Sequence, residues 1–209
     1  IDTPGHEAFS KMRRRGLEVA DLAILVVAVD DGVQPQTKEA IKIIQASKIP
    51  FVVALNKIDK TGVNVDRVKD ALAAEGIFFE GSGGDVSFQP ISAKTGEGIP
   101  ELLDLLALVA EVHELEANLL LPGEGIIIES KLDGRKGITA TGIIKNGTLR
   151  VGDKIAAGDA RGKVRGLESF AGQRIESATP CLPVLIFGFE TIPQIGERFY
   201  SGSPAEVEP

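Results

Sequence analysis

The run Phe51–Leu55 constrains the fold of this chain more than any other stretch. Its residues are all apolar and include the β-branched Val52 and Val53, a pattern typical of a strand that is buried on both faces of a parallel sheet. The strand ends directly in Asn56-Lys57-Ile58-Asp59, and polar groups at the carboxyl end of such a strand form ligand sites. The sequence therefore predicts an α/β domain with a binding site at that edge of its sheet.

The order of the polar residues after this strand fits a guanine base. Guanine presents a ring N–H and an exocyclic amino group side by side, and the single carboxylate of Asp59 can accept both hydrogen bonds. Adenine cannot donate that pair. Asn56 can supply amide contacts to the base and the loop, and the stem of Lys57 can lie along the base plane. An isolated N-K-x-D pattern also arises by chance, so the interpretation needs support elsewhere in the chain.

A first supporting motif is Asp2-Thr3-Pro4-Gly5, which has the D-x-x-G form. The carboxylate of Asp2 can hold a magnesium-bound water, and the amide of Gly5 can meet a terminal phosphate. These two residues predict that Mg²⁺ accompanies the nucleotide.

A second supporting motif is Ser92-Ala93-Lys94, which follows another apolar run. The backbone N–H of Ala93 can donate to the guanine carbonyl, and Lys94 can cover the other face of the ring. The three motifs occur in the order of a P-loop GTPase, with Asn56 54 positions after Asp2 and Ser92 36 positions after Asn56. Together they predict GTP or GDP as the ligand.

These motifs and their surroundings resemble the translational GTPases. The runs that carry the resemblance are Asp2–Phe9, Asp31–Thr37 and Asn56–Lys60. More narrowly, the chain resembles the family of bacterial translation initiation factor 2 at Gly83–Asp85, Ser92–Gly96 and Asn146–Asp153. The resemblance covers essentially the whole chain. It implies a cytoplasmic GTPase that acts on the ribosome during initiation, with initiator tRNA bound only by domains beyond this chain.

The resemblance also implies roles for single residues. In this family the histidine that follows the phosphate-sensing glycine orients the attacking water, so His6 is the expected catalytic residue. The expected metal-binding residue is Asp2. The expected nucleotide-binding residues are Asp2, Gly5, Asn56, Lys57, Asp59, Ser92, Ala93 and Lys94.

The phosphate-binding loop of a P-loop GTPase has no counterpart in the sequence. No G-x-x-x-x-G-K-[ST] occurs in the 209 residues, although the family places one ahead of the D-x-x-G. Because the chain also begins with Ile1, we expect it to be a piece of a longer GTPase, with little activity alone. Two alternatives remain: another translational GTPase, such as an elongation factor, or an inactive module that binds the ribosome or RNA.

Residues 1–117 are expected to form the later two-thirds of the GTP-binding domain. Apolar strands at 23–29 and 51–55 alternate with helices at about 36–47 and 65–76, which predicts parallel pairing with right-handed crossovers. Leucines and alanines at helical spacing predict one long helix over 99–120, and His113 on it has no second His or Cys at ligand spacing.

Residues 118–209 are expected to form an all-β antiparallel barrel. Short strands are predicted at 125–131, 139–145, 154–156 and 163–167, separated by turns such as Asn146-Gly147. Arg161, Lys163 and Arg165 alternate and so share one strand face. That face is either simply solvated or contacts ribosomal RNA phosphates, with Arg135, Lys136 and Lys145 as companions.

Charge and apolar patterns complete the predictions. The net charge of −7 lies entirely in residues 1–117, since residues 118–209 are neutral. The apolar run Leu22–Val29 is too short to span a bilayer, so no membrane partner is expected. Cys181 has apolar neighbours and is predicted to be a buried, inert thiol.

The strand at Ile24–Val29 is expected to have a bare edge, through which the chain can self-associate.

Overall fold

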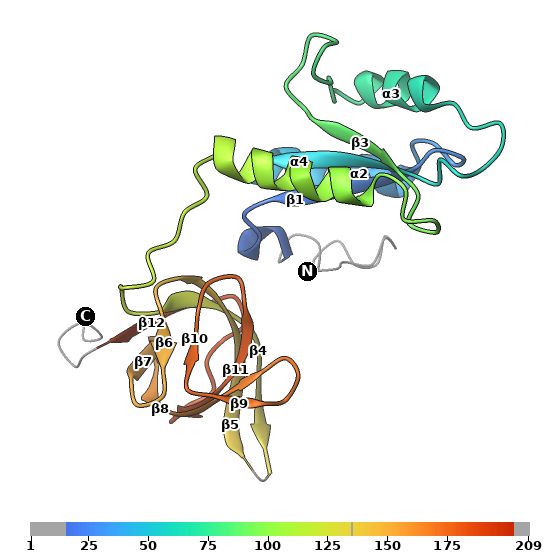
Figure 1. Cartoon of the computed structure of the whole chain (residues 1–209). Helices are drawn as coiled ribbons and strands as arrows, with labels where there is room; N and C mark the ends of the chain where they lie inside the picture. The colour runs from blue at the N-terminus through green and yellow to red at the C-terminus, as the bar shows by residue number, and fades with distance from the viewer. Residues whose placement is uncertain (1–15, 135, 203–209) are drawn as a thin grey trace. The chain divides into compact units, whose positions relative to one another are not determined.

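The computed structural model describes residues 16–134 and 136–202 of the chain, which forms an α/β unit and a β-barrel unit (Figure 1). The division between the two compact units falls after Leu115. None of the helices in the described part is long and apolar enough to cross a membrane.

The α/β unit is built on a three-stranded parallel sheet with the order β1-β2-β3. Its strands are β1 (Ala23–Ala28), β2 (Phe51–Asn56) and β3 (Phe88–Ile91), and its helices are α2 (Pro35–Ser47), α3 (Val65–Ala74) and α4 (Ile99–Val112). Ala28 of β1 lies opposite Asn56 of β2, and Asn56 lies opposite Ile91 of β3. The carboxyl ends of all three strands therefore meet at one edge, and the predicted parallel sheet is confirmed.

The central strand β2 is covered on both faces. Residues 52–55 are completely buried. Val53 and Leu55 pack in the cluster that contains Ile41 and Ile44 of α2 and Val68 and Leu72 of α3. Val52 and Ala54 pack in a second cluster with Leu102 of α4. This strand has the two buried faces that its unbroken apolar run predicts.

Strand β1 is buried on one face only. Leu25 and Val27 face the core, whereas Ile24 and Val26 are 45% and 57% exposed. The reason is the placement of the helices: the cluster under α4 draws its strand residues from β2 and β3, not from β1. Among the described residues β1 pairs only with β2, so it is an edge strand.

Helix α4 ends at Val112, so the predicted continuation to residue 120 is wrong. Glu114 adopts a left-handed conformation with φ 50° and donates to the carbonyl of Glu111. Leu115 donates to the carbonyl of Ala110, and these two bonds complete a Schellman termination. The apolar repeat continues beyond the helix, but Leu115 and Leu120 there are exposed to solvent.

The second unit is a closed antiparallel barrel, as predicted. Its ring runs β11-β5-β4-β12-β7-β8 and closes by pairing of β8 with β11. The strands are β4 (Glu124–Asp133), β5 (Gly137–Asn146), β7 (Lys154–Ala157), β8 (Ala160–Ser169), β11 (Pro183–Phe189) and β12 (Arg198–Gly202). The short strand β9 (Arg174–Ile175) pairs with β8, and β6 (Leu149–Arg150) and β10 (Ser177–Ala178) form a separate two-stranded antiparallel sheet. Phe189, Phe199 and Ile127 fill its interior.

Cys181 is exposed, so the prediction of a buried thiol is wrong. It has a left-handed backbone with φ 67° just before β11, and its N–H donates to the carbonyl of Ile144 at 2.9 Å. This turn directs the side chain outward, and the neighbouring Leu182 is also 51% exposed. Apolar neighbours in the sequence therefore did not indicate burial here.

Candidate nucleotide-binding site

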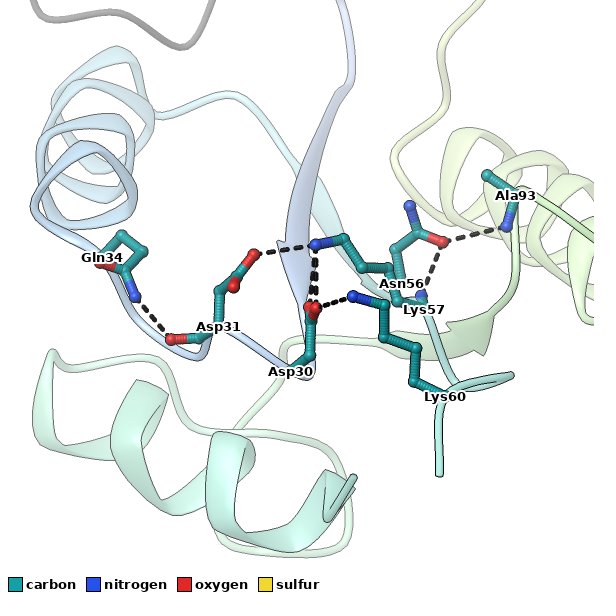
Figure 2. A network of polar contacts seen from close by, with 7 residues as sticks. All are labelled: Asp30, Asp31, Gln34, Asn56, Lys57, Lys60 and Ala93. Atoms are coloured by element: carbon teal, nitrogen blue, oxygen red, sulfur yellow. Dashed lines mark hydrogen bonds and ion pairs between the residues drawn. The ribbon is translucent and has the colours of Figure 1, made fainter. Parts of the chain in front are cut away.

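Asn56 joins the two loops that leave β2 and β3. It is the last residue of β2, and its Oδ1 accepts hydrogen bonds from the backbone N–H of Lys57 at 2.7 Å and of Ala93 at 3.0 Å (Figure 2). Lys57 has φ 72°, so the chain turns sharply after the strand. One amide oxygen thus brings together residues that are 37 positions apart.

Asp59 and Ser92 form the second link between these loops. The Ser92 hydroxyl, which is fully buried, donates to Asp59 Oδ1 at 2.7 Å and accepts from the N–H of Thr95 at 3.2 Å. Asp59 itself is exposed, and its Oδ2 makes no hydrogen bond or ion pair with any residue that the structure describes. The carboxylate is thus fixed at one oxygen and open to a donor at the other.

The loop after β3 is held by its own backbone. Ser92 N–H donates to the Glu97 carbonyl, and Gly96 N–H donates to the Ser92 carbonyl, both at 2.8 Å. The Ala93 N–H, predicted as the donor to the guanine carbonyl, is engaged by Asn56 in this structure. Contact with a base would have to share or replace that bond. Lys94 is exposed on the same loop.

Two acids that follow β1, to which the sequence assigned no role in the site, complete the cluster. The Lys57 ammonium lies 2.9 Å from Asp30 Oδ1 and 2.8 Å from Asp31 Oδ2 (Figure 2). The Lys60 ammonium also pairs with Asp30. A signal was present in the sequence, because the two acids directly follow the apolar run that forms the neighbouring strand.

These ion pairs change the proton affinities of their members. Hydrogen bonds from Lys60 and then Lys57 lower the pKa of Asp30 from 3.8 to about 2, against an opposing effect of burial. Hydrogen bonds to Asp31 and then Asp30 raise the pKa of Lys57 above its ordinary value. Both groups therefore stay ionised over the whole neutral range, and the cluster keeps its charge pattern.

The phosphate and metal residues predicted from the sequence belong to the part of the chain that the structure does not describe. Asp2, Gly5 and His6 lie outside the described residues, as does Arg135 of the barrel. Within the described ranges there is no group of three or more His, Cys, Asp or Glu side chains that could hold a metal ion. The structure thus brings together the predicted base-reading residues Asn56, Asp59, Ser92 and Ala93.

The larger of two cavities in the described part of the α/β unit lies away from this polar cluster, and the smaller one touches only its acidic side. A cavity of about 750 Å³ lies along β1 and α2 and is lined mainly by apolar residues such as Leu17, Ile24 and Ile44. A smaller one of about 450 Å³ adjoins Asp30 and Lys60. We locate the site by its convergent polar groups, because an exposed sheet edge can read a flat base without a deep cavity.

Comparison with protein families identifies the class of protein. The family described as "Elongation factor Tu GTP binding domain" matches residues 1–112, and the family "Elongation factor G domain 2" matches residues 122–202. The chain therefore belongs to the family of GTP-binding domains represented by elongation factor Tu, followed by the barrel domain that such factors carry.

The most similar relatives include proteins named translation initiation factor IF-2. That of Microcystis aeruginosa is 50% identical over 199 residues, which is 95% of this chain and 20% of the relative. The chloroplastic protein of Rhodomonas salina is 48% identical over 95% of this chain and 26% of its own length. The resemblance to bacterial initiation factor 2 is confirmed, and the chain spans only about a quarter of these relatives.

Solved structures show the same fold. GDP-bound aIF5B from Aeropyrum pernix has a TM-score of 0.73 and 28% identity, covering 99% of this chain and 43% of that one. Elongation factor SelB from Methanococcus maripaludis, in its apo form, has a TM-score of 0.70 and 26% identity, covering 88% of this chain and 40% of that one. The first of these structures contains GDP, and the second is named as a translation elongation factor.

Proposed function

We propose that the chain is the guanine-nucleotide-binding part of a translation initiation factor that hydrolyses GTP on the ribosome in the cytoplasm. The observation that carries this proposal is the pairing of Asn56 with Ala93 and of Asp59 with Ser92 at one edge of the sheet. Membership of a GTP-binding family and likeness to relatives named initiation factors support it.

The contacts at this edge support the following roles. The carboxylate of Asp59 accepts the ring N–H and amino group of guanine, while Ser92 holds it in place. The N–H of Ala93 is shared between the Asn56 oxygen, which sets the distance between the two loops, and the guanine carbonyl. The stems of Lys57 and Lys94 cover the two faces of the ring. Rejection of adenine follows, because adenine lacks the donor pair that Asp59 requires.

Three residues near the start of the chain are proposed to act on the phosphates and the metal. Asp2 would hold Mg²⁺ through a water, Gly5 would meet the terminal phosphate, and His6 would orient the attacking water. Initiator tRNA is contacted by parts of the factor other than these 209 residues. The elongation-factor alternative shares the base-reading loops, but the relatives named above favour initiation.

The test uses the full-length factor that contains this chain. Calorimetry should show saturable binding of GDP and none of ADP at the same concentration, and phosphate release from GTP should rise when ribosomes are added. Equal affinity for GDP and ADP would contradict the assignment of the site. Nucleotide binding without any response to ribosomes would contradict the assignment to initiation.

A further part of the proposal concerns ribosomal RNA. Arg161, Lys163 and Arg165 are all exposed on one face of β8, as their alternation predicted. Lys163 also lies directly opposite Lys154 of β7 in the antiparallel register. Like charges in that position destabilise the strand pair, which favours a ligand with phosphates on this face. The predicted companion Lys136 instead pairs with Glu168.

Substituting Lys163 tests this assignment. Lys163→Ala should weaken binding of the barrel-bearing chain to ribosomal RNA and reduce the slope of log affinity against log salt by about 1. Lys131→Ala is the matched control, because Lys131 is an exposed barrel lysine that already pairs with Glu129. If both variants change the slope equally, the face of β8 is not the contact.

A further inference from the structure

The Lys57 side chain spans two strand ends. Because β1 and β2 pair in parallel with Ala28 opposite Asn56, the residues that follow each strand emerge side by side. The pairing extends one step further, since Val29 N–H donates to the Asn56 carbonyl at 2.9 Å. Asp30 therefore lies next to the loop that begins at Lys57, although they are 27 positions apart.

The ammonium of Lys57 is held from two sides. It donates to Asp30 and to Asp31, which uses two of its three N–H donors. A lysine stem normally keeps several rotamers, and a pair of acids at its end selects one of them. The stem of Lys57 is thereby stretched from the end of β2 toward the end of β1 (Figure 2).

The acids also connect this lysine to the start of α2. Gln34 donates through Nε2 to the backbone carbonyl of Asp31 at 2.5 Å, and its backbone N–H donates to the Thr37 hydroxyl within the capping box of α2. The turn that carries Asp30 and Asp31 is therefore fixed at both of its ends. It is a rigid support rather than a loose loop that happens to meet a lysine.

We propose that Asp30 and Asp31 are positioning residues for guanine recognition, which hold the Lys57 ammonium so that its stem presents a fixed surface to the base. This inference rests on the proposed function, because it assigns a task to Lys57 in that site. The two acids do not touch the base in this role. They act through Lys57, and they couple the β1–α2 turn to the base-reading loop.

The two acids differ in their partners, and this difference decides which variant is the better test. Asp30 forms ion pairs with both Lys60 and Lys57, and only 18% of its side chain is exposed. Among the described residues, Asp31 forms an ion pair only with Lys57, and its side chain is 56% exposed. Asp31→Asn is therefore the gentler variant for folding, and Asp30→Asn is a second variant that removes the shared anchor.

The experiment is a double-mutant cycle in the full-length factor. GDP affinity is measured by calorimetry for the unmutated protein, Asp31→Asn, Lys57→Met and the combined variant. We expect Asp31→Asn to weaken GDP binding about tenfold, and to have no further effect once Lys57 is Met. Asp31→Glu should restore most of the affinity. Asp70→Asn, which removes the same charge from an exposed site on α3, should leave GDP affinity unchanged.

Each other outcome overturns the inference. If Asp31→Asn and Asp30→Asn leave GDP affinity unchanged, the acids do not position the base site. If the substitutions of the acids weaken GDP binding by the same factor whether position 57 is Lys or Met, the acids act on general structure and not through Lys57. Failure of the unmutated factor to bind GDP overturns the proposed function and this inference with it, whereas normal binding with additive effects overturns the inference alone.

Discussion

Single side chains at the ends of β2 and β3 determine what this sheet edge can bind. The Asn56 oxygen accepts two backbone N–H groups, and the buried Ser92 hydroxyl both donates to Asp59 and accepts from Thr95. Loss of one such partner leaves a donor unpaired and costs about 1–3 kcal/mol where the group is buried. The loops are thus held by few bonds, each of which matters for the position of the Asp59 carboxylate.

Asp59 itself should decide which base is bound. Asp59→Asn in the full-length factor replaces an acceptor by a donor, which mispairs with the amino group of guanine but suits the C2 carbonyl of xanthine. A site built on paired hydrogen bonds can reject a mismatch by about 10,000-fold, so preference should move from GTP to XTP. Competition binding with both nucleotides measures the change. A variant that still prefers GTP would show that Asp59 does not read the base.

The ion pairs of Asp30 should appear in the acid unfolding of the chain. Its pKa is about 2 in the folded protein and 3.8 ordinarily, so its stabilising contribution is present above about pH 4. That contribution is lost as the pH falls through this window toward 2. Asp30→Asn should therefore lower the free energy of unfolding at pH 6. It should also make that free energy depend less steeply on pH between pH 4 and pH 2.

Urea unfolding of the 209-residue chain at several pH values provides the measurement. Asp70→Asn is the control, since the side chain of this exposed aspartate on α3 makes no hydrogen bond or ion pair with the residues described. Equal acid sensitivity of Asp30→Asn and the unmutated chain would contradict the ion-pair account.

Whole elements were predictable where one physical requirement dominates. The strand β2 was evident because a strand buried on both faces must be continuously apolar, and residues 52–55 are fully buried. The end of α4 was not evident, because a left-handed glutamate at position 114 stops the helix while the apolar repeat continues. Strands β11 and β12 were missed too. They close the barrel by pairing with distant strands, which local turn signals do not reveal.

The edge strand β1 should promote self-association. Its residues 24–28 contain no charge or proline, and in the described part of the chain β1 pairs only with β2. The exposed Ile24 and Val26 add apolar surface. We therefore expect the 209-residue chain to form dimers or larger species at tens of micromolar in size exclusion coupled to light scattering.

A charge on this strand should suppress the association. Val26→Lys places a lysine at a position that is 57% exposed on β1, and lysine on an edge strand opposes pairing with another chain. Leu108→Lys is the matched control, because Leu108 is 56% exposed on α4. A monomeric unmutated chain, or equal effects of both substitutions, would show that association does not proceed through β1.

At the scale of the whole chain, the proposed base-reading site combines residues from three strand ends. The contacts of Asn56, Asp59, Ser92 and Ala93 were predictable in outline because each follows an apolar strand, and parallel strands align their carboxyl ends. The pairing of Lys57 with Asp30 and Asp31 was not, because no motif marks those acids. Their place depends on the register between β1 and β2, which a single sequence does not specify.

The 209-residue chain should bind guanine nucleotides only weakly and hydrolyse GTP at background rate. Its described contacts serve the base, whereas the chain contains no G-x-x-x-x-G-K-[ST] whose backbone amides and lysine would hold the phosphates. With base contacts alone, the dissociation constant should be about millimolar, near −4 kcal/mol. Guanosine and GDP should then bind with similar affinity, because the phosphates add little. Calorimetry with both ligands and a phosphate-release assay make the comparison, and micromolar GDP binding by this chain would show that its own residues hold the phosphates.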